Sequence, residues 1–239
     1  MFDNPVFCAL DTADVTSAAA LGGTLAGVAG GLKIGMELFY AGGGDGYRRI
    51  AAAGLPVFLD LKLHDIPNTV AAGIRALLPL RPAIINVHAA GGSAMMAAAA
   101  GAAKEAGSGS RPWVIAVTVL TSLDGDDLAA AGVTASPRDQ AVRLAALARN
   151  AGLDGVVCSG HEIAAIRAEC GADFRLIVPG LRPAGAAAGD QKRVMTPRQA
   201  RELGADVLVI GRPITAAPDP ARAAREIVSG LGAGCGQMN

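Results

Sequence analysis

The sequence has few aromatic residues and no excess of charge of either sign. Phe, Trp and Tyr make up 3% of its 239 residues, whereas hydrophobic residues of all kinds make up 51%. We therefore expect a core of Ala, Val, Leu and Ile, which suits parallel strands covered by helices on both sides. The 21 basic and 21 acidic residues balance, so the composition indicates no broad surface for nucleic acid or membrane. Any anionic ligand must be held by a local site.

Cysteine and histidine are also scarce, and their spacing does not match the common zinc and disulfide patterns. The three histidines have no His-x-x-His spacing, and the four cysteines form no Cys-x-x-Cys pair. We therefore expect no metal and no cofactor, and free thiols in a reducing cytoplasm. The residues concerned are His64, His88, His161, Cys8, Cys158, Cys170 and Cys235.

No segment of the sequence predicts export or insertion into a membrane. The first residues include Asp3 and no basic residue, unlike a signal peptide. Residues 83–103 carry no charge over about the length of a membrane span. However, Asn86, His88 and the pair Gly91–Gly92 interrupt this stretch. A strand, a turn and an Ala-rich helix therefore explain it better.

Short apolar runs rich in β-formers recur along the chain, and each is followed by turn residues and a helix-like segment. Eight such units in this length predict a single (β/α)₈ barrel (TIM barrel) over residues 1–239, with a flexible tail at 231–239. An open doubly wound sheet is the alternative, although no Gly-x-Gly-x-x-Gly follows the first strand. The predicted strands are Val6–Asp11, Gly31–Met36, Val57–Leu63, Ala83–His88, Val114–Leu120, Gly155–Ser159, Arg175–Pro179 and Asp206–Gly211.

Polar residues gather at the downstream ends of these strands, which is the rim that carries the active site in this fold. Two of the four lysines, Lys33 and Lys62, lie inside apolar strands, where an unpaired ammonium is costly. Side chains alternate along a strand, so Asp60 and Lys62 are expected to point together into the barrel mouth. A buried structural ion pair is the alternative, and ion pairs alone are weak evidence of function. Their position at the rim favours catalysis.

The stretch FLDLKLHDIPNTV at 58–70 resembles the signature of the orotidine 5′-phosphate decarboxylase family. That signature is Asp-x-Lys-x-x-Asp followed by Ile-Pro-x-Thr. The likeness extends over almost the whole chain, through Asp11, Lys33 in GLKIG, AVTVLTS, VPGLRP, GDQKRVMTP and VIGRPI, all in the family's order. Asp-x-Lys-x-x-Asp alone is less decisive, because sugar-phosphate lyases of the same superfamily share it.

The resemblance implies a cofactor-independent conversion of orotidine 5′-phosphate to uridine 5′-phosphate, the last step of pyrimidine synthesis. Lys62 would donate the proton to C6 of the pyrimidine, and Asp60 would lie against the substrate carboxylate. Lys33 and Asp11 would bind the ribose hydroxyls and complete an alternating network of charges. A vinyl-type carbanion has no neighbouring electron sink, so fixed charge aimed at C6 is the main device available.

The resemblance also implies a homodimer with shared sites. Asp65 and Thr69 would reach the neighbouring chain's site, while Thr121 would bind the edge of the pyrimidine. For Thr121 and Ser122, a turn that caps the next segment is the alternative.

A phosphate site is expected in the loops after the seventh and eighth strands, where barrel enzymes often bind phosphate. Arg182, Gln191, Gly211 and Arg212 fall in these loops. An arginine matches phosphate oxygens in bidentate fashion, and glycine lets the backbone approach closely. Taken singly, either arginine would be interpreted as a solvated surface residue. The small-residue loop at 181–190 is expected to act as a lid that excludes water, with a plain flexible connection as the alternative.

Two other functions are compatible with part of this pattern. A metal-dependent sugar-phosphate lyase or epimerase on the same barrel would share Asp-x-Lys-x-x-Asp, but would not be expected to carry Thr121 with the Arg182–Gln191 segment. A non-enzymatic nucleotide-binding barrel would be expected to have lost Lys62 or Asp60, and both are present.

Overall fold

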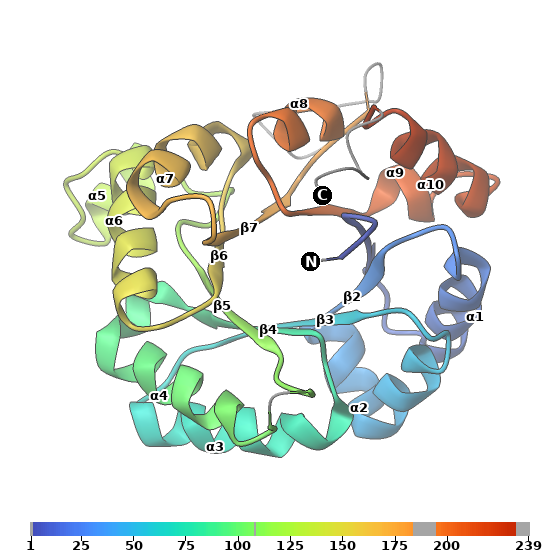
Figure 1. Ribbon diagram of the computed structural model, residues 1–239, viewed down its shortest axis with the longest axis horizontal. Coiled ribbons are helices and arrows are strands. Elements are labelled where there is room, and N and C mark those ends of the chain that lie inside the picture. The colour runs from blue at the N-terminus through green and yellow to red at the C-terminus, as the bar shows by residue number, and fades with distance from the viewer. Residues whose placement is uncertain (1, 108, 184–194, 233–239) are drawn as a thin grey trace.

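The computed structural model describes residues 2–107, 109–183 and 195–232. Its eight strands are all parallel and pair in chain order, and the first closes on the last, through Val6 beside Leu208 and Cys8 beside Ile210. Figure 1 looks along this barrel and shows the strands as a ring inside a layer of helices. The predicted (β/α)₈ barrel is therefore confirmed. The strands are β1 (Val6–Leu10), β2 (Gly31–Gly35), β3 (Val57–Leu63), β4 (Ile84–His88), β5 (Trp113–Val117), β6 (Gly155–Val157), β7 (Arg175–Pro179) and β8 (Val207–Ile210).

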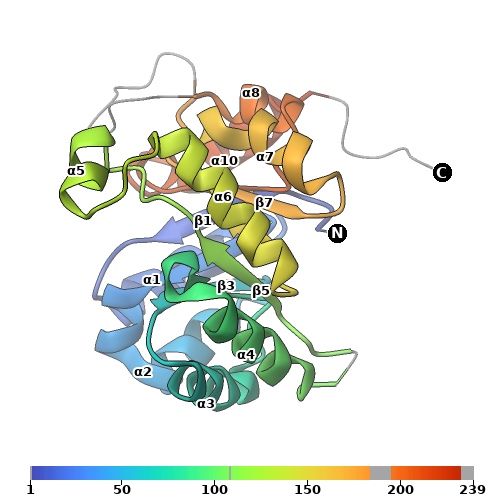
Figure 2. The same ribbon diagram turned by 90° about the vertical axis from the view of Figure 1, so that its left-hand side faces the viewer.

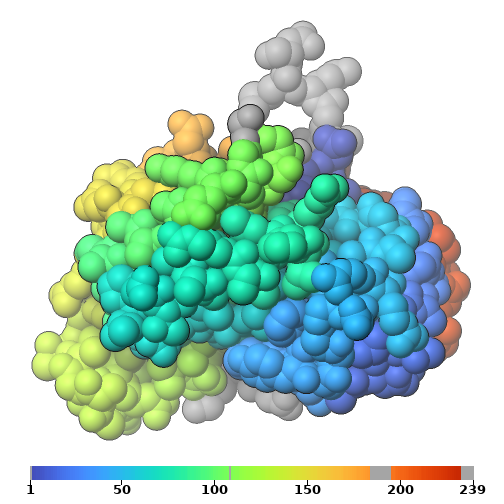
Figure 3. All heavy atoms as spheres, turned by 90° about the horizontal axis from the view of Figure 1, so that it is seen from below, coloured from blue at the N-terminus to red at the C-terminus, as the bar shows by residue number. Residues whose placement is uncertain are grey.

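The helices of the described residues follow the strands and cover the outside of the barrel. They are α1 (Val15–Leu25), α2 (Met36–Ala51), α3 (Pro67–Leu77), α4 (Gly92–Lys104), α5 (Gly125–Ala130), α6 (Pro137–Asn150), α7 (Ile163–Cys170), α8 (Pro197–Glu202), α9 (Arg212–Thr215) and α10 (Pro220–Ser229), with 3₁₀ turns at Leu78–Leu80, Ala89–Gly91 and Gly160–Glu162. Figure 3 shows one face of the molecule, on which the side chains of α2, α3 and α4 form a continuous cover.

Several helices begin at a side chain that accepts hydrogen bonds from the first turn. Asp14 accepts from the amides of Thr16 and Ser17 at the start of α1. Thr196 and Gln199 cap each other's backbone amides at the start of α8. Such caps satisfy amides that have no partner within the helix, so polar residues in the loops set where these helices begin.

The core has two parts. The larger part, between sheet and helices, is rich in Ala, Val, Leu and Ile, as expected. The smaller part fills the barrel interior, and here the expectation of a core without aromatics is wrong: Phe7 and Phe58 lie inside the barrel, and Phe2 and Trp113 pack against this cluster. Phe2 contacts the rings of Phe7 and Trp113, at centroid distances of 5.0 and 4.8 Å. The few aromatics are concentrated where large side chains are needed to fill a closed barrel.

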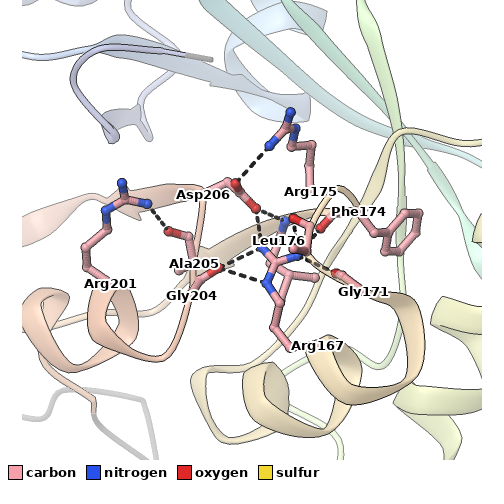
Figure 4. A network of polar contacts seen from close by, with 10 residues as sticks. Arg167, Gly171, Phe174, Arg175, Leu176, Arg201, Gly204, Ala205 and Asp206 are labelled. Atoms are coloured by element: carbon pink, nitrogen blue, oxygen red, sulfur yellow. Dashed lines mark hydrogen bonds and ion pairs between the residues drawn. The ribbon is translucent and has the colours of Figure 1, made fainter. Parts of the chain in front are cut away.

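An ionic cluster joins β7, β8 and α7 at the end of the barrel where the strands begin. Asp206 accepts from the guanidinium groups of Arg167 and Arg175 and from the amide of Leu176. Figure 4 shows Arg167 reaching Asp206 and the carbonyl groups around it. The side chain of Asp206 is only 5% exposed, so its charge is balanced and hydrogen-bonded, as burial requires.

The two ends of the barrel differ. In Figure 2, β1 points toward the end where α5 lies and away from the N-terminus. The aromatic cluster fills the barrel near the N-terminal end, which leaves the other end for a ligand. The stretch at 83–103 forms β4, a 3₁₀ turn and α4, as predicted. No helix among the described residues is long and apolar enough to span a membrane. Most of the tail predicted at 231–239 lies outside the described residues.

Candidate active site

Four charged residues meet at the C-terminal ends of the first three strands. Lys33 lies in β2, Asp60 and Lys62 lie in β3, and Asp11 directly follows β1. The ammonium nitrogen of Lys33 is 3.3 Å from Asp11 Oδ1 and 3.3 Å from Asp60 Oδ2. Lys62 Nζ is 2.7 Å from Asp60 Oδ1. The charges therefore alternate along a chain from Asp11 through Lys33 and Asp60 to Lys62.

The last residues of β3 do not continue as a regular strand. Lys62 has a φ of 52°, a left-handed conformation that costs an L-residue roughly 1–2 kcal/mol. The pairing of β3 with β4 shifts register between Leu59 and Leu63. The simple alternation that was expected to bring Asp60 and Lys62 together is therefore broken at Lys62. The two side chains meet because the backbone is bent there.

Asn86, the middle residue of β4, contacts this bend. Its Nδ2 donates to Asp60 Oδ1 at 2.7 Å, and its Oδ1 accepts from the backbone amide of Lys62 at 2.7 Å. Asn86 is fully buried. The sequence pattern placed Asn86 among the polar residues of the strands that face the expected active-site rim, but no role in the site was predicted for it.

Asp60 remains charged despite its burial. Burial by itself raises the pKa of this carboxyl group, but the ammonium groups of Lys33 and Lys62 and hydrogen bonds from Lys62 and Asn86 together lower it by more. The net effect holds the pKa of Asp60 below its ordinary value of 3.8. A fixed carboxylate thus faces the ligand space between two ammonium groups.

Two adjoining cavities open on these charges and share Lys33, Pro179 and Val209 in their walls. The first, of about 140 Å³, also contacts Asp60, Lys62 and Thr121. Its walls therefore combine charged groups with apolar side chains, which suits a flat, partly polar ring. These apolar side chains were not predicted as part of the site, and they include Phe58, Val117, Val119, Leu120, Val157 and Ile177.

The second cavity, of about 190 Å³, lies beside the loops after β7 and β8. Its walls include Asp11, Arg182, Gly211 and Arg212. Arg182 is 8% exposed, and its Nε has no hydrogen-bond partner among the described residues. A Cβ at Gly211 would lie 3.3 Å from Asp11 Oδ2, so a larger residue would crowd the site. An anion in this cavity would have two arginines within reach, although Gln191 and residues 184–190 of the predicted lid lie outside the described residues.

Asp65 and Thr69 are placed differently from the other predicted residues. Both are exposed, Asp65 in the loop after β3 and Thr69 in the first turn of α3. Neither lies in the wall of the two cavities of its own chain. Asp65 Oδ1 accepts from the amide of Ile66 at 2.6 Å. The fold of one chain therefore does not bring Asp65 and Thr69 into the site.

The two histidines nearest the site stack on each other. The rings of His64 and His88 are 5.4 Å apart at their centroids and inclined by 19°. Burial, and then the charges of His64 and Lys62, lower the pKa of His88. The described residues contain no group of three or more His, Cys, Asp or Glu arranged to hold a metal ion. Of the cysteines, Cys8, Cys158 and Cys170 are buried free thiols.

The model of the orotidine 5′-phosphate decarboxylase / HUMPS family matches residues 4–227 of the chain. The chain belongs to this family. It is 57% identical over 228 residues to the orotidine 5′-phosphate decarboxylase of Erythrobacter litoralis, covering 95% of this chain and 99% of that one. It is 55% identical over 231 residues to that of Rhodospirillum rubrum, covering 95% and 94%.

Solved structures of the family show the same barrel. The crystal structure of orotidine 5′-phosphate decarboxylase from Lactobacillus acidophilus has a TM-score of 0.83 and 37% identity, covering 96% of this chain and 100% of that one. The structure from Pyrococcus horikoshii, at 24% identity and a TM-score of 0.75, covers 95% and 98% and shares the fold. The resemblance stated from the motifs is therefore confirmed.

Proposed function

We propose that the protein converts orotidine 5′-phosphate to uridine 5′-phosphate and carbon dioxide in pyrimidine synthesis. The observation that carries the proposal is the alternating row Asp11, Lys33, Asp60 and Lys62 at the mouth of the barrel. The relatives that are 50–57% identical over nearly the whole chain bear the name of this decarboxylase. The activity needs a charged site beside an apolar wall and an anion site close to it, and the two adjoining cavities, which share Lys33, Pro179 and Val209, support this proposal.

In this proposal Lys62 is the proton donor. The bond between C6 and the carboxylate carbon breaks, its electron pair stays on C6, and carbon dioxide leaves. The Nζ–H of Lys62 then protonates C6, and solvent returns a proton to the amine. Because Lys62 is paired with Asp60 at 2.7 Å, its positive charge is in place before the carbanion forms. Such preorganised charge stabilises a transition state more than it stabilises the substrate.

Asp60 and Lys33 would also contact the substrate. The carboxylate of Asp60 would face the substrate's carboxylate, and this repulsion is relieved as carbon dioxide departs. Lys33 and Asp11 would bind the ribose hydroxyls, because Lys33 lies in the walls of both cavities and Asp11 pairs with it. Thr121, in the wall of the first cavity, would bind the pyrimidine edge.

Arg182 and Arg212 would bind the phosphate, with Gly211 letting it approach the backbone. Two guanidinium groups in one cavity suit a phosphate dianion. Gln191, in the segment outside the described residues, would complete this site. The lid role of residues 181–190 is part of the proposal.

We also propose a homodimer in which Asp65 and Thr69 enter the partner's site. Both are exposed and lie outside the cavities of their own chain. Large apolar side chains are exposed close by: Ile66 in the same loop, and Met36 and Tyr40 at the start of α2. Such side chains favour a protein interface near this rim. A cytoplasmic location is proposed with it, because the described cysteines are unpaired.

One assay tests the proposal. Purified protein is incubated with orotidine 5′-phosphate, and the loss of substrate absorbance is followed as uridine 5′-phosphate forms. We expect turnover, and we expect it to survive exhaustive chelation, because side chains supply the charge. Turnover that returns only on addition of Mg²⁺ would favour the sugar-phosphate lyase alternative. Binding of uridine 5′-phosphate without turnover would favour the nucleotide-binding barrel.

A further inference from the structure

Asn86 lies behind the proposed catalytic pair and uses both of its polar groups on it. Its Nδ2 donates to Asp60 Oδ1, and its Oδ1 accepts from the backbone amide of Lys62, each at 2.7 Å. Asp60 Oδ1 is the same oxygen that accepts from Lys62 Nζ. The side-chain amide of Asn86 therefore connects the carboxylate of Asp60 to the backbone of Lys62, whose ammonium group pairs with the same carboxylate.

The two bonds meet different needs of the site. Lys62 is in the left-handed region, one of two non-glycine residues among those described with positive φ, and the β3–β4 ladder is irregular there. The hydrogen bond from its amide to Asn86 replaces a ladder bond and holds this conformation. The bond to Asp60 stops the carboxylate from turning, so Oδ1 stays toward Lys62 and Oδ2 toward Lys33.

The chemistry at this position requires a neutral group with one donor and one acceptor. The donor must face a carboxylate and the acceptor must face an N–H, so the two ends of the amide are not interchangeable. An aspartate would place a second carboxylate against Asp60. A leucine of similar shape would leave the Lys62 amide without its acceptor and would remove one of the two donors to Asp60 Oδ1. Asn86 is fully buried in β4 and is not in the walls of the two described cavities. It therefore acts through its neighbours and not on the substrate.

We propose that Asn86 is a positioning residue, which holds the carboxylate of Asp60 and the backbone of Lys62 in the arrangement that proton transfer to C6 needs. This inference rests on the proposed decarboxylase function. The product, uridine 5′-phosphate, has no carboxylate and needs no proton, so its binding depends little on this arrangement. Loss of Asn86 should then reduce turnover far more than product affinity.

The test compares Asn86→Leu with Thr118→Val. Thr118 is another buried polar residue, directly after β5, and its hydroxyl donates to the carbonyl of Val157 at 2.9 Å. We expect Asn86→Leu to lower kcat by about a hundredfold or more, as displacement of a reacting group by an ångström can do. Its Kd for uridine 5′-phosphate should change by less than about threefold, because the product lacks the transition-state interactions. Thr118→Val should keep kcat within about threefold, since it loses one neutral hydrogen bond.

A second variant, Asn86→Asp, gives a pH profile and covers the case in which Asn86→Leu does not fold. A protonated carboxyl can donate to Asp60 and accept from Lys62, whereas an ionised one cannot donate. The neighbouring carboxylate raises the pKa of the new group. We expect kcat of Asn86→Asp relative to wild type to rise as the pH is lowered.

The outcomes separate the two proposals. Wild-type protein without turnover overturns the proposed function and this inference together. If the wild type is active, the inference alone fails when kcat of Asn86→Leu is within about fivefold of the wild-type value. Misplacement of the reacting groups is expected to lower kcat by about a hundredfold. The inference fails as well if kcat and product affinity fall by the same factor, or if the Asn86→Asp ratio is flat with pH.

Discussion

Lys62 Nζ lies 2.7 Å from Asp60 Oδ1. The backbone of Lys62 is left-handed, so the regular alternation of side chains along a strand does not account for this contact. This pair, with 30% and 12% of its side chains exposed, is partly shielded and faces the first cavity. A structural pair alone would be as well served by apolar residues. The position of the pair beside a cavity therefore favours a role in the reaction.

Lys62→Ala should abolish decarboxylation and leave the affinity for uridine 5′-phosphate largely intact. The lysine is assigned to the transition state, and each tenfold loss of rate corresponds to roughly 1.4 kcal/mol of lost stabilisation. We expect losses of many factors of ten in kcat, measured by the absorbance assay, with product binding followed by calorimetry. A variant within about tenfold of wild type would contradict the assignment of Lys62.

Arg212→Ala should lower kcat as well as raise KM, although Arg212 lies in the wall of the second cavity and not in that of the cavity beside Lys62. Energy from phosphate binding is expected to drive closure over the substrate and so to assemble the charged site. The control is Arg198→Ala, which removes an exposed arginine of α8 paired with Glu202. A change in KM alone would show that phosphate binding is not coupled to the chemistry.

Mixed dimers test whether Asp65 acts in the partner's site. Lys62→Ala and Asp65→Ala should each be nearly inactive alone. In a mixed dimer one site has both changes and the other has neither. Unfolding, mixing and refolding should make about half of the dimers mixed and return roughly a quarter of wild-type activity.

The control for this experiment is wild-type protein unfolded and refolded in the same way. If the wild type recovers and the mixture does not, Asp65 acts within its own chain and the shared site is wrong. An active protein that is monomeric in solution would contradict the shared site in the same way.

His88 should make the free energy of unfolding depend on pH below about 6.5. Burial, followed by the charges of His64 and Lys62, lowers its pKa below the ordinary value of 6.5. As the pH falls, His88 is therefore protonated in the unfolded chain before it is protonated in the folded chain. Stability from this group is complete above pH 6.5 and declines as the pH falls toward the folded pKa.

Urea unfolding between about pH 5 and 8 measures this dependence. We expect His88→Gln to have a smaller slope than wild type in this range. His161→Gln, which removes an exposed histidine, is the matched control and should keep the wild-type slope. Equal slopes in wild type and His88→Gln would exclude His88 as the source.

Asp206→Ala should destabilise the protein without altering the site. It removes the buried partner of Arg167 and Arg175 at the closed end of the barrel, and breaking a buried pair costs roughly 3–5 kcal/mol. The melting temperature should fall by about 10 °C, while kcat of the folded protein is unchanged. Asp45→Ala, which removes an exposed pair with Arg48, should show no measurable change. An equal effect of both variants would show that the Asp206 cluster has no special role.

The fold class and the family could both be predicted from the order of residues along the chain. Regular alternation of apolar runs and turns predicted eight strands, and two of them, Val57–Leu63 and Arg175–Pro179, have the predicted bounds. The other strands begin or end up to three residues away. For example, β5 ends at Val117, not Leu120, although the amide and the hydroxyl of Thr118 still donate to the carbonyl of Val157 in β6. The periodicity of apolar residues identifies strands well because it depends on residues that are close in the sequence, whereas the ends of a strand depend on how it pairs with neighbouring strands.

The construction of the site depends on contacts that form only in the folded barrel. The motif names Asp60 and Lys62, but the bend at Lys62 and its support by Asn86 arise from pairing with β4, 24 residues away. The burial of Arg182 likewise depends on loops that are distant in sequence. Periodicity reports which side of an element is apolar. It carries no information on which polar groups from separate strands meet, because barrel closure and register set those distances.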